Sequence, residues 1–339
     1  MVKIVGLGQP VLDAIVHIPS DWYLGALETT RGARRVVDDG LFMCALGFVE
    51  EFGVTWSSGG SSGNTLRILA QLGADAILCG QISQDQYARQ YMDEARAAGL
   101  RLSMNTAPHG STRRALCLIT PDDGQRTFFS CPGIDDHLTT LDPCRGAFRG
   151  ARIAHFEGFA FLDEAACALA REAITFARSS GAMVSLDVSD PSVARAIPRD
   201  LRRIIEEGLI DILFMNDEEV CLVAGQPQSE WLFAAIQIST WMQDGLIVFK
   251  RGGEGSGCCS RSGVIHFPAT PTTVVDTTGA GDAYAAGFLY GLLREWEYER
   301  CGRFASEVAS LVVAQTGATL RDVSQLLLVR DRFHALTQT

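Results

Sequence analysis

From residue 151 onward the chain alternates between short apolar segments and amphipathic segments, and this alternation restricts the fold more than any other feature. The apolar segments are typical of buried strands and cover residues 151–156, 183–187, 212–215 and 247–249. The amphipathic segments have helical periodicity and cover residues 163–179, 198–207 and 229–241. Such alternation is typical of parallel strands joined by crossover helices. We therefore predict an α/β fold with a mostly parallel central sheet and helices on both faces.

The first 150 residues contain similar elements and also an irregular stretch. Strands are predicted at residues 2–5, 76–79, 112–119 and 126–130, and helices at 85–98 and after Asn64, which is a suitable N-cap. A Pro-Asp-Asp-Gly sequence at 121–124 predicts a hairpin turn between the last two strands. Residues 19–51 are interrupted by four glycines, so we expect short strands or a flap there rather than core helices.

Composition excludes several classes of protein. The chain has 339 residues, of which 47% are hydrophobic and 20% are charged, as in globular proteins. No apolar run reaches the roughly 20 residues that span a bilayer, and the start of the chain lacks the layout of a signal peptide. A net charge of −11 argues against a nucleic-acid partner. Ten cysteines without a Cys-x-x-Cys pair indicate reduced thiols rather than a zinc site. We therefore expect a cytoplasmic protein.

A glycine-rich turn at residues 274–282 leads into an apolar, alanine-rich helical segment. Gly279, Ala280 and Gly281 leave backbone N–H groups accessible at a helix N-terminus, which is a suitable place to bind an anion. Asp282 follows at once and has two interpretations. Either it caps the helix and pairs with its dipole, or it is a general base beside an anion site, as phosphoryl transfer to a hydroxyl requires.

Three more polar turns accompany the predicted strands, whose carboxyl ends lie together in a parallel sheet. The first is glycine-rich and runs from Gly59 to Asn64. The second, at residues 216–219, is either the acidic first turn of a helix or part of a site for hydrated Mg²⁺. The third, at residues 250–255, is either a tight turn between strands or a loop under a nucleotide phosphate.

The N-terminal segment contains an incomplete glycine motif and an isolated carboxylate. Residues 6–8 read Gly-Leu-Gly, but Val11 stands where a dinucleotide-binding fingerprint has its third glycine, and an extended segment follows instead of a helix. The sequence therefore argues against a nicotinamide-dependent dehydrogenase. Asp13 lies between apolar residues of the extended segment and either faces water or accepts a hydrogen bond from a sugar hydroxyl.

Together these motifs resemble the PfkB, or ribokinase-like, family of carbohydrate and nucleoside kinases, from Val5 to about Thr319. The resemblance implies a three-layer fold and transfer of the γ-phosphoryl group of ATP to a primary hydroxyl. It implies that Asp282 is the general base and that the amides of residues 279–281 form the anion hole. The implied substrate contacts are Asp13, Gly59, Gly60, Ser61, Asn64, Arg113 and Phe159. The implied nucleotide contacts are Asn216, Lys250, Gly252, Gly255 and Thr278.

The resemblance also implies metal ions and a lid. Mg²⁺ is expected near Glu219, bound through water, and K⁺ near Asp276 is an option because many family members use it. A small β-sheet lid would comprise residues 13–53 and 104–131, while residues 1–12, 54–103 and 132–339 form the core domain. The lid would cover the substrate, exclude water and join two subunits in a homodimer. The expected partners are ATP and a sugar or nucleoside, with neither nucleic acid nor membrane.

The sequence leaves the acceptor open. Residues 157–159 and 189–191 resemble the adenosine kinase branch, in which an aromatic residue near Phe159 stacks on a base. Arg113 and Arg114 instead suit a carboxylate or phosphate on a sugar. A catalytically silent sugar-binding regulator on the same fold is a further alternative, although the intact Asp282 and its glycines argue against it.

Overall fold

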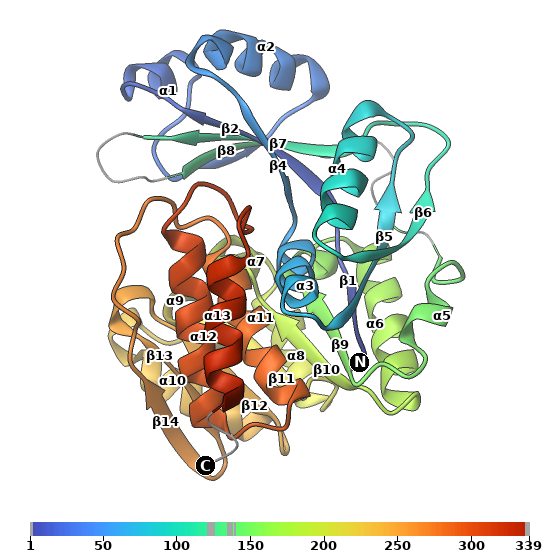
Figure 1. The fold of residues 1–339 in the computed structure, drawn as a ribbon, viewed down its shortest axis with the longest axis vertical. Coiled ribbons are helices and arrows are strands. Elements are labelled where there is room, and N and C mark those ends of the chain that lie inside the picture. The colour runs from blue at the N-terminus through green and yellow to red at the C-terminus, as the bar shows by residue number, and fades with distance from the viewer. Residues whose placement is uncertain (1–2, 121–125, 134–137, 139, 336–339) are drawn as a thin grey trace.

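The structure is a computed structural model that describes residues 3–120, 126–133, 138 and 140–335. A nine-stranded sheet crosses the larger part of the molecule (Figure 1). Its strands, in spatial order, are β14 (Gly263–Phe267), β13 (Ser256–Ser260), β12 (Leu246–Lys250), β11 (Ile212–Asn216), β10 (Met183–Asp187), β9 (Ile153–Glu157), β1 (Lys3–Leu7), β5 (Asp75–Ile82) and β6 (Arg101–Thr106). Neighbouring strands are parallel except in the two pairs that include β13.

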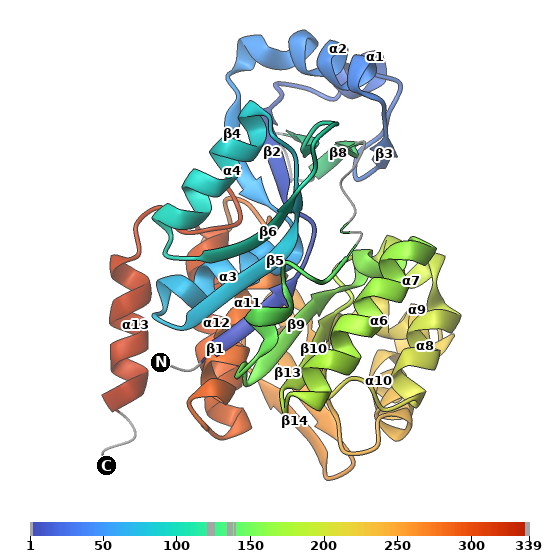
Figure 2. The same cartoon turned by 90° about the vertical axis from the view of Figure 1, so that its right-hand side faces the viewer.

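Helices cover both faces of this sheet (Figure 2). One face packs against α3 (Ser61–Gln71), α4 (Gln86–Ala97), α11 (Ala280–Leu293), α12 (Tyr298–Val313) and α13 (Ser324–Ala335). The other packs against α5 (Arg145–Phe148), α6 (Glu164–Ser179), α7 (Pro191–Ala196), α8 (Pro198–Glu206), α9 (Asp217–Ala224) and α10 (Trp231–Trp241). Successive strand residues point to opposite faces, so Ile4 and Val5 enter different hydrophobic cores. The predicted three-layer α/β fold is confirmed. Among the described residues, no helix is both long and apolar enough to cross a membrane.

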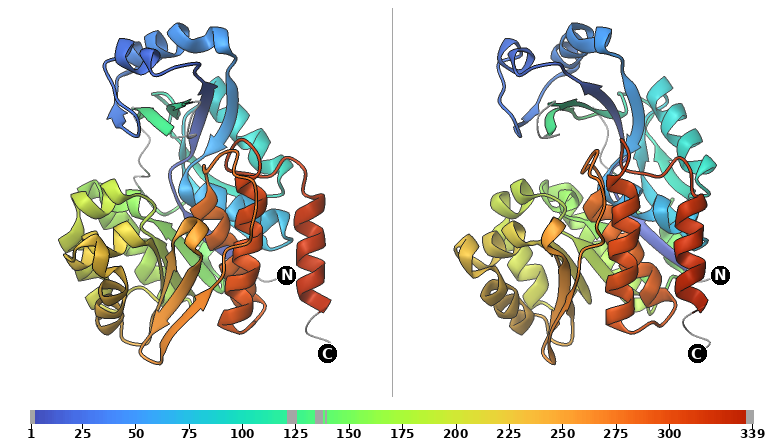
Figure 3. Two further views of the ribbon diagram at one scale, coloured as in Figure 1. Left: turned by 90° about the vertical axis from the view of Figure 1, so that its left-hand side faces the viewer. Right: turned by 60° about the vertical axis from the view of Figure 1, so that its left-hand side comes forward.

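A second, five-stranded sheet lies at one end of the molecule (Figure 3). Its spatial order is β3 (Arg34–Val36), β8 (Arg126–Cys131), β7 (Arg113–Ile119), β2 (Val11–His17) and β4 (Thr55–Gly59). Strands β7 and β8 pair antiparallel, while the hairpin turn predicted at 121–124 lies outside the described residues. The predicted lid comprised residues 13–53 and 104–131. The small sheet also includes β4, which follows the first of these segments, whereas β6, which overlaps the start of the second, belongs to the large sheet.

The expectation of short strands or a flap rather than core helices at 19–51 is only partly right, because the segment holds the short strand β3 and two helices as well. This segment contains α1 (Trp22–Ala26) and α2 (Asp39–Val49), which cover the outer face of the small sheet. Asp38 caps α2 by accepting a hydrogen bond from the backbone N–H of Leu41 at 2.8 Å. Gly40 and Gly47 lie on the exposed side of α2, where each costs about 1 kcal/mol relative to alanine. Burial of an apolar stripe with helical spacing outweighs this cost: Phe42, Ala45, Leu46 and Val49.

Candidate active site

A cavity of about 860 Å³ separates the small sheet from the carboxyl ends of β9–β12 and the start of α11. Two of the predicted site residues, Gly59 and Asp276, lie directly behind its wall, next to Asp13 and Thr278 respectively. The other predicted site residues all line it: Asp13, Gly60, Ser61, Asn64, Arg113, Phe159, Asn216, Glu219, Lys250, Gly252, Gly255, Thr278, Gly279, Ala280, Gly281 and Asp282. The structure therefore gathers residues from the whole length of the chain at one place.

Each of four adjacent parallel strands ends in a polar residue; those of β9, β11 and β12 line the cavity, and that of β10 lies buried beside Lys250. These terminal residues are Glu157 of β9, Asp187 of β10, Asn216 of β11 and Lys250 of β12. Neither Asp187 nor Glu157 is among the site residues predicted from the sequence, although Glu157 belongs to the segment 157–159 that resembles the adenosine kinase branch. A polar residue that closes an apolar strand is the signal that would have identified both.

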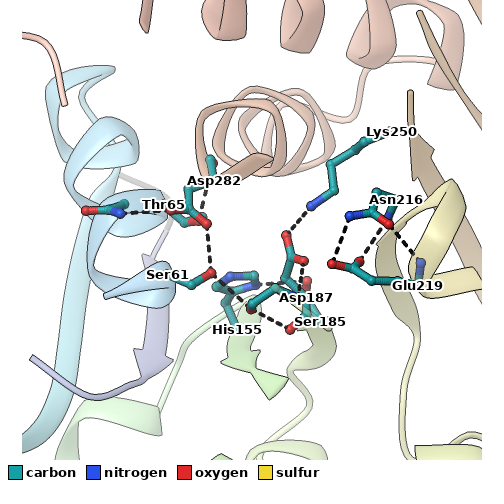
Figure 4. A network of polar contacts seen from close by, with 11 residues as sticks. Ser61, Thr65, His155, Ser185, Asp187, Asn216, Glu219, Lys250 and Asp282 are labelled. Atoms are coloured by element: carbon teal, nitrogen blue, oxygen red, sulfur yellow. Dashed lines mark hydrogen bonds and ion pairs between the residues drawn. The ribbon is translucent and has the colours of Figure 1, made fainter. Parts of the chain in front are cut away.

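The carboxylate of Asp282, in the first turn of α11, is held by side chains of α3 (Figure 4). Oδ1 accepts a hydrogen bond from the hydroxyl of Ser61 at 2.7 Å, and Oδ2 accepts one from the amide of Asn64 at 2.8 Å. Thr65 donates to the backbone carbonyl of Asp282 at 3.2 Å. These contacts join two glycine-rich turns that are far apart in the sequence. They also fix the direction in which the carboxylate points.

The role predicted for Asn64 as an N-cap is wrong. Helix α3 begins at Ser61 and its N-cap is Gly60, which has a φ of 89°. A Cβ on Gly60 would lie 2.4 Å from the carbonyl oxygen of Gln9, so the close approach of the two backbones requires glycine there. Asn64 consequently lies within the first turn of α3, and its amide is available to Asp282.

The turn before α11 is held in a left-handed conformation by Asp276. Gly279, the N-cap of α11, has a φ of 74°, and a Cβ there would lie 2.6 Å from the Cβ of Ala318. The carboxylate of Asp276 accepts hydrogen bonds from the backbone N–H and the hydroxyl of Thr278, at 2.8 and 2.5 Å. It also accepts one from the N–H of Gly317 at 2.8 Å. Asp276 therefore aligns the residues whose N–H groups begin α11.

Several carboxyl groups at the cavity hold their protons more tightly than usual. Burial, reinforced by the charge of Asp187, raises the pKa of Asp282 from 3.8 to about 6, and the hydrogen bonds from Asn64 and Ser61 oppose this shift. Burial also raises the pKa of Asp13 to about 6, against the opposing charges of nearby arginines. It raises the pKa of Glu157 to about 7, although this carboxylate accepts hydrogen bonds from the N–H groups of Gln9 and Ser62. Groups of this kind are candidates for proton transfer near neutral pH.

Lys250 lines the cavity and forms an ion pair with the buried Asp187, with Nζ 2.7 Å from Oδ2. Burial alone would lower the pKa of Lys250, but the charges of Asp187 and Glu219 outweigh it and raise that pKa. Below the pair lies His155, whose Nδ1 is 3.1 Å from the hydroxyl of Ser185. Burial lowers the pKa of His155 from 6.5 to about 4, so its ring is neutral at physiological pH.

Asn216 and Glu219 form a capping box at the start of α9. The carboxylate of Glu219 accepts hydrogen bonds from the backbone N–H of Asn216 at 2.8 Å and from its side-chain amide at 3.1 Å. Within the described residues, no three His, Cys, Asp or Glu side chains converge to hold a metal ion. One or two carboxylates facing a phosphate site do suit a hydrated Mg²⁺, which keeps most of its waters. The donors present therefore fit a metal ion bound through water rather than a caged one.

The arginines of the small sheet divide between its two faces. On β7, Arg114 borders the cavity, but its guanidinium pairs with Asp39 and stacks on Phe42 and Tyr87, at 4.9 and 4.7 Å from the ring centroids. Arg113, one residue earlier, belongs to the cavity face, because side chains alternate along a strand. Of the two arginines that suit an anionic group by their sequence, Arg114 therefore has its guanidinium engaged with Asp39.

Three more cationic residues, which were not among the predicted site residues, line the cavity. Arg34 of β3 and Arg126 of β8 reach it from the small sheet, and Arg251 reaches it from the turn after β12. Arg251 stacks on Trp231 at 4.1 Å from the ring centroid and directly precedes the 3₁₀ turn Gly252–Glu254, which connects β12 to β13. Residues 251–255 therefore form a tight turn between two strands, and this turn borders the cavity as well.

Comparison with known proteins agrees with this geometry. A family model described as pfkB family carbohydrate kinase matches residues 44–325. A nucleoside kinase of Methanothermobacter thermautotrophicus is 30% identical over 260 residues, which cover 76% of this chain and 79% of the relative. A fructokinase of Escherichia coli is 27% identical over 77% of this chain and 87% of its own length. The structure of adenosine kinase from Sinorhizobium meliloti has a TM-score of 0.89 at 23% identity, covering 98% of this chain and 99% of that one.

Fold, cavity and relatives together define a phosphotransferase that acts on a hydroxyl group, with ATP as phosphoryl donor. The chain belongs to the pfkB family of carbohydrate kinases. The predicted resemblance to that family and the predicted class of enzyme are confirmed.

Proposed function

We propose that this chain transfers the γ-phosphoryl group of ATP to a primary hydroxyl of a sugar or nucleoside, with Asp282 as general base. The observation that carries the proposal is the position of Asp282: its carboxylate lines the cavity, is oriented by two side chains of α3, and lies in the first turn of α11. A carboxylate whose pKa is raised toward neutrality is well matched to accept a proton from a hydroxyl as the new P–O bond forms.

The start of α11 supplies the proposed anion hole. The first regular hydrogen bond of this helix runs from the N–H of Ala283 to the carbonyl of Gly279 at 2.8 Å, so the N–H groups of Gly281 and Asp282 precede it. Together with the helix dipole, these groups favour the charge that develops on the transferring phosphoryl group. Nζ of Lys250 lies 3.1 Å from where a Cβ on Gly281 would be, which places a cation beside the same group.

The nucleotide is proposed to bind on the side of the cavity formed by Lys250, Gly252, Gly255, Asn216 and Thr278. Glu219 and Asn216 would hold a hydrated Mg²⁺, which supplies charge neutralisation for the phosphate oxygens when it is bound. K⁺ near Asp276 also remains a proposal. Both carboxylate oxygens of Asp276 already accept hydrogen bonds within the chain, so Asp276 orders the turn before α11 whether or not K⁺ is bound.

The acceptor is proposed to lie between Asp282 and the small sheet, where Asp13, Gly59, Gly60, Ser61, Asn64, Arg113 and Phe159 surround it. The small sheet would act as a lid that excludes water from the phosphoryl group. A nucleoside acceptor draws support from Phe159 and Phe128, two aromatic rings in the cavity wall. The predicted homodimer through the lid also stays a proposal; its contact would involve α1 and α2, which expose Trp22, Met43 and Phe48.

Acceptor-dependent release of ADP tests the proposal. We expect the purified protein to release ADP from ATP and Mg²⁺ at a rate that depends on an added acceptor, assayed across pentoses, hexoses, sugar acids and nucleosides, each with and without K⁺. Product analysis should find one new phosphate ester per ADP. Tight acceptor binding without any ADP release would instead favour the silent sugar-binding regulator.

The rate is expected to depend on the ionisation of Asp282. Because its pKa in the folded protein is about 6, the base is ionised above that pH and protonated below it. We therefore expect kcat/KM to be level at higher pH and to fall about tenfold per pH unit below about 6. The profile should be measured with a neutral acceptor, so that only the enzyme titrates. A level profile down to pH 4.5, with circular dichroism unchanged, would contradict the assignment.

A further inference from the structure

Three arginines project from the small sheet toward the same side of the cavity. The strand register pairs Arg34 of β3 with Phe128 of β8, and Arg126 lies two residues before Phe128. The side chains of Arg34, Arg126 and Phe128 therefore share one face of the small sheet. Arg113 of β7 and Asp13 of β2 lie on this face too, because Asp13 pairs with Ala115. All of these residues line the cavity. The wall opposite Asp282 is therefore rich in guanidinium groups, although the chain as a whole has a net charge of −11.

Arg34 lies between the two aromatic rings of the cavity wall. Its guanidinium is 4.5 Å from the centroid of Phe128 and 5.7 Å from that of Phe159. Its contact with a carboxylate is loose, since Nη2 is 3.5 Å from Oδ2 of Asp190. A planar base that stacked between these rings would have to displace Arg34. The guanidinium of Arg34, by contrast, is already stacked on an aromatic ring. Its N–H groups lie in the plane of the guanidinium and are directed outward from its edge.

Arg126 packs against the same aromatic wall. Its guanidinium lies 5.6 Å from the centroid of Phe128. In the part of the chain that the structure describes, no carboxylate comes within ion-pair distance of it, whereas Arg114 is paired with Asp39 and Lys250 with Asp187. The charges of Arg34 and Arg126 both act on Asp13, and Arg34 also has its loose contact with Asp190, so the excess positive charge lies at Arg126. Positive charge that lacks compensation in a cleft attracts anions.

We propose that the acceptor carries an anionic group, a carboxylate or a phosphate, which binds Arg34 and Arg126 with Arg113 beside them, while its hydroxyl faces Asp282. This inference rests on the proposed function, because it takes Asp282 as the reacting end of the cavity. Guanidinium groups bind carboxylate and phosphate oxygens through paired charge-assisted hydrogen bonds, and the stacked arginines lose little conformational freedom in doing so. The substrate class is thus an acidic or already phosphorylated sugar.

Binding of matched probes in the absence of ATP tests the inference separately from catalysis. The probes are D-gluconate against D-glucose, and D-ribose 1-phosphate against D-ribose, titrated calorimetrically into the full-length protein. The first pair reports a carboxylate and the second a phosphate. The variants are Arg34→Gln and Arg126→Gln. The matched control is Arg35→Gln, because Arg35 follows Arg34 on β3, points to the other face and contacts the carbonyl of Leu27.

We expect the protein to bind at least one anionic probe about tenfold or more tightly than its neutral counterpart. Arg34→Gln and Arg126→Gln should each remove most of this difference, leave the neutral probes within about twofold, and act on KM more than on kcat in turnover assays. The control Arg35→Gln should retain the difference in affinity between the anionic and the neutral probes. Equal or weaker binding of both anionic probes, or equal losses on charged and neutral probes, would overturn the inference.

The two proposals fail in different ways. Arginine-dependent binding of an anionic probe without any ADP release would support the inference and refute the kinase proposal. Efficient ADP release on neutral acceptors, with no preference for the anionic members of the pairs, would refute the inference and leave the kinase proposal standing.

Discussion

Asp282→Asn is expected to lower kcat by roughly 10²–10⁴-fold, the usual contribution of a general base. The asparagine retains the size of the side chain and an oxygen that accepts from Asn64, so the geometry of the α3–α11 contact is preserved. What is lost is the ability to accept the proton of the acceptor hydroxyl. Binding of ATP and acceptor should therefore stay within a fewfold of the wild type, as measured by equilibrium titration.

The same substitution is expected to stabilise the fold at high pH. The pKa of Asp282 is raised from 3.8 to about 6, so the folded protein holds this proton more tightly than the unfolded chain does. The resulting stabilisation is complete below about pH 3.8 and is lost as the pH rises through about 6, at most roughly 3 kcal/mol. Asparagine does not ionise, so the variant should denature at higher urea than the wild type at pH 8, with a smaller difference near pH 5.

The control for this experiment is Asp244→Asn, which removes an exposed carboxylate that does not line the cavity. It should leave both kcat and urea resistance unchanged. Retention of more than about a tenth of kcat in Asp282→Asn would remove Asp282 from the role of base.

Lys250→Met is expected to destabilise the fold by about 3 kcal/mol, because it leaves the carboxylate of Asp187 buried without its cation. The side chain of Asp187 is only 1% exposed, so water cannot replace the lost partner. Methionine fills the space of the lysine stem, which limits the cavity contribution. The measurement is the free energy of unfolding from urea titration, together with ADP release at saturating acceptor.

The matched control replaces both partners. In the double variant Asp187→Asn with Lys250→Met, no unpaired charge remains. The introduced amide oxygen can still accept from the backbone N–H of Ser189, which bonds Asp187 at 2.9 Å in the wild type. This double variant should recover most of the lost stability without recovering activity, because a cation beside Gly281 is still missing. Equal destabilisation of the single and double variants would contradict the charge argument and indicate loss of packing instead.

Periodicity and strand ends made much of this molecule predictable from its sequence. Mostly apolar runs such as 183–187 and 212–215 match β10 and nearly all of β11, because strands buried on both faces need a high content of apolar residues. The glycine-rich turns at 59–63 and 279–281 were identified for a similarly local reason, since a turn that feeds a helix N-terminus carries its own sequence signal. The two glycines of α2 argue against a helix, and only the spacing of Phe42, Ala45, Leu46 and Val49 indicates one.

What the sequence determined by itself is therefore local: which segments form strands and helices, which turns leave N–H groups open, and which carboxylate follows the glycines. The tertiary structure alone decided the partners. Ser61 and Asn64 meet Asp282 across more than two hundred residues, Asp187 meets Lys250, and Arg34 and Arg126 share a wall with Asp13. The tertiary structure also decided that the side chains of the neighbouring Arg113 and Arg114 lie on opposite faces of the small sheet, where the guanidinium of Arg114 pairs with Asp39. Such contacts depend on strand order and register, and no short-range pattern encodes them.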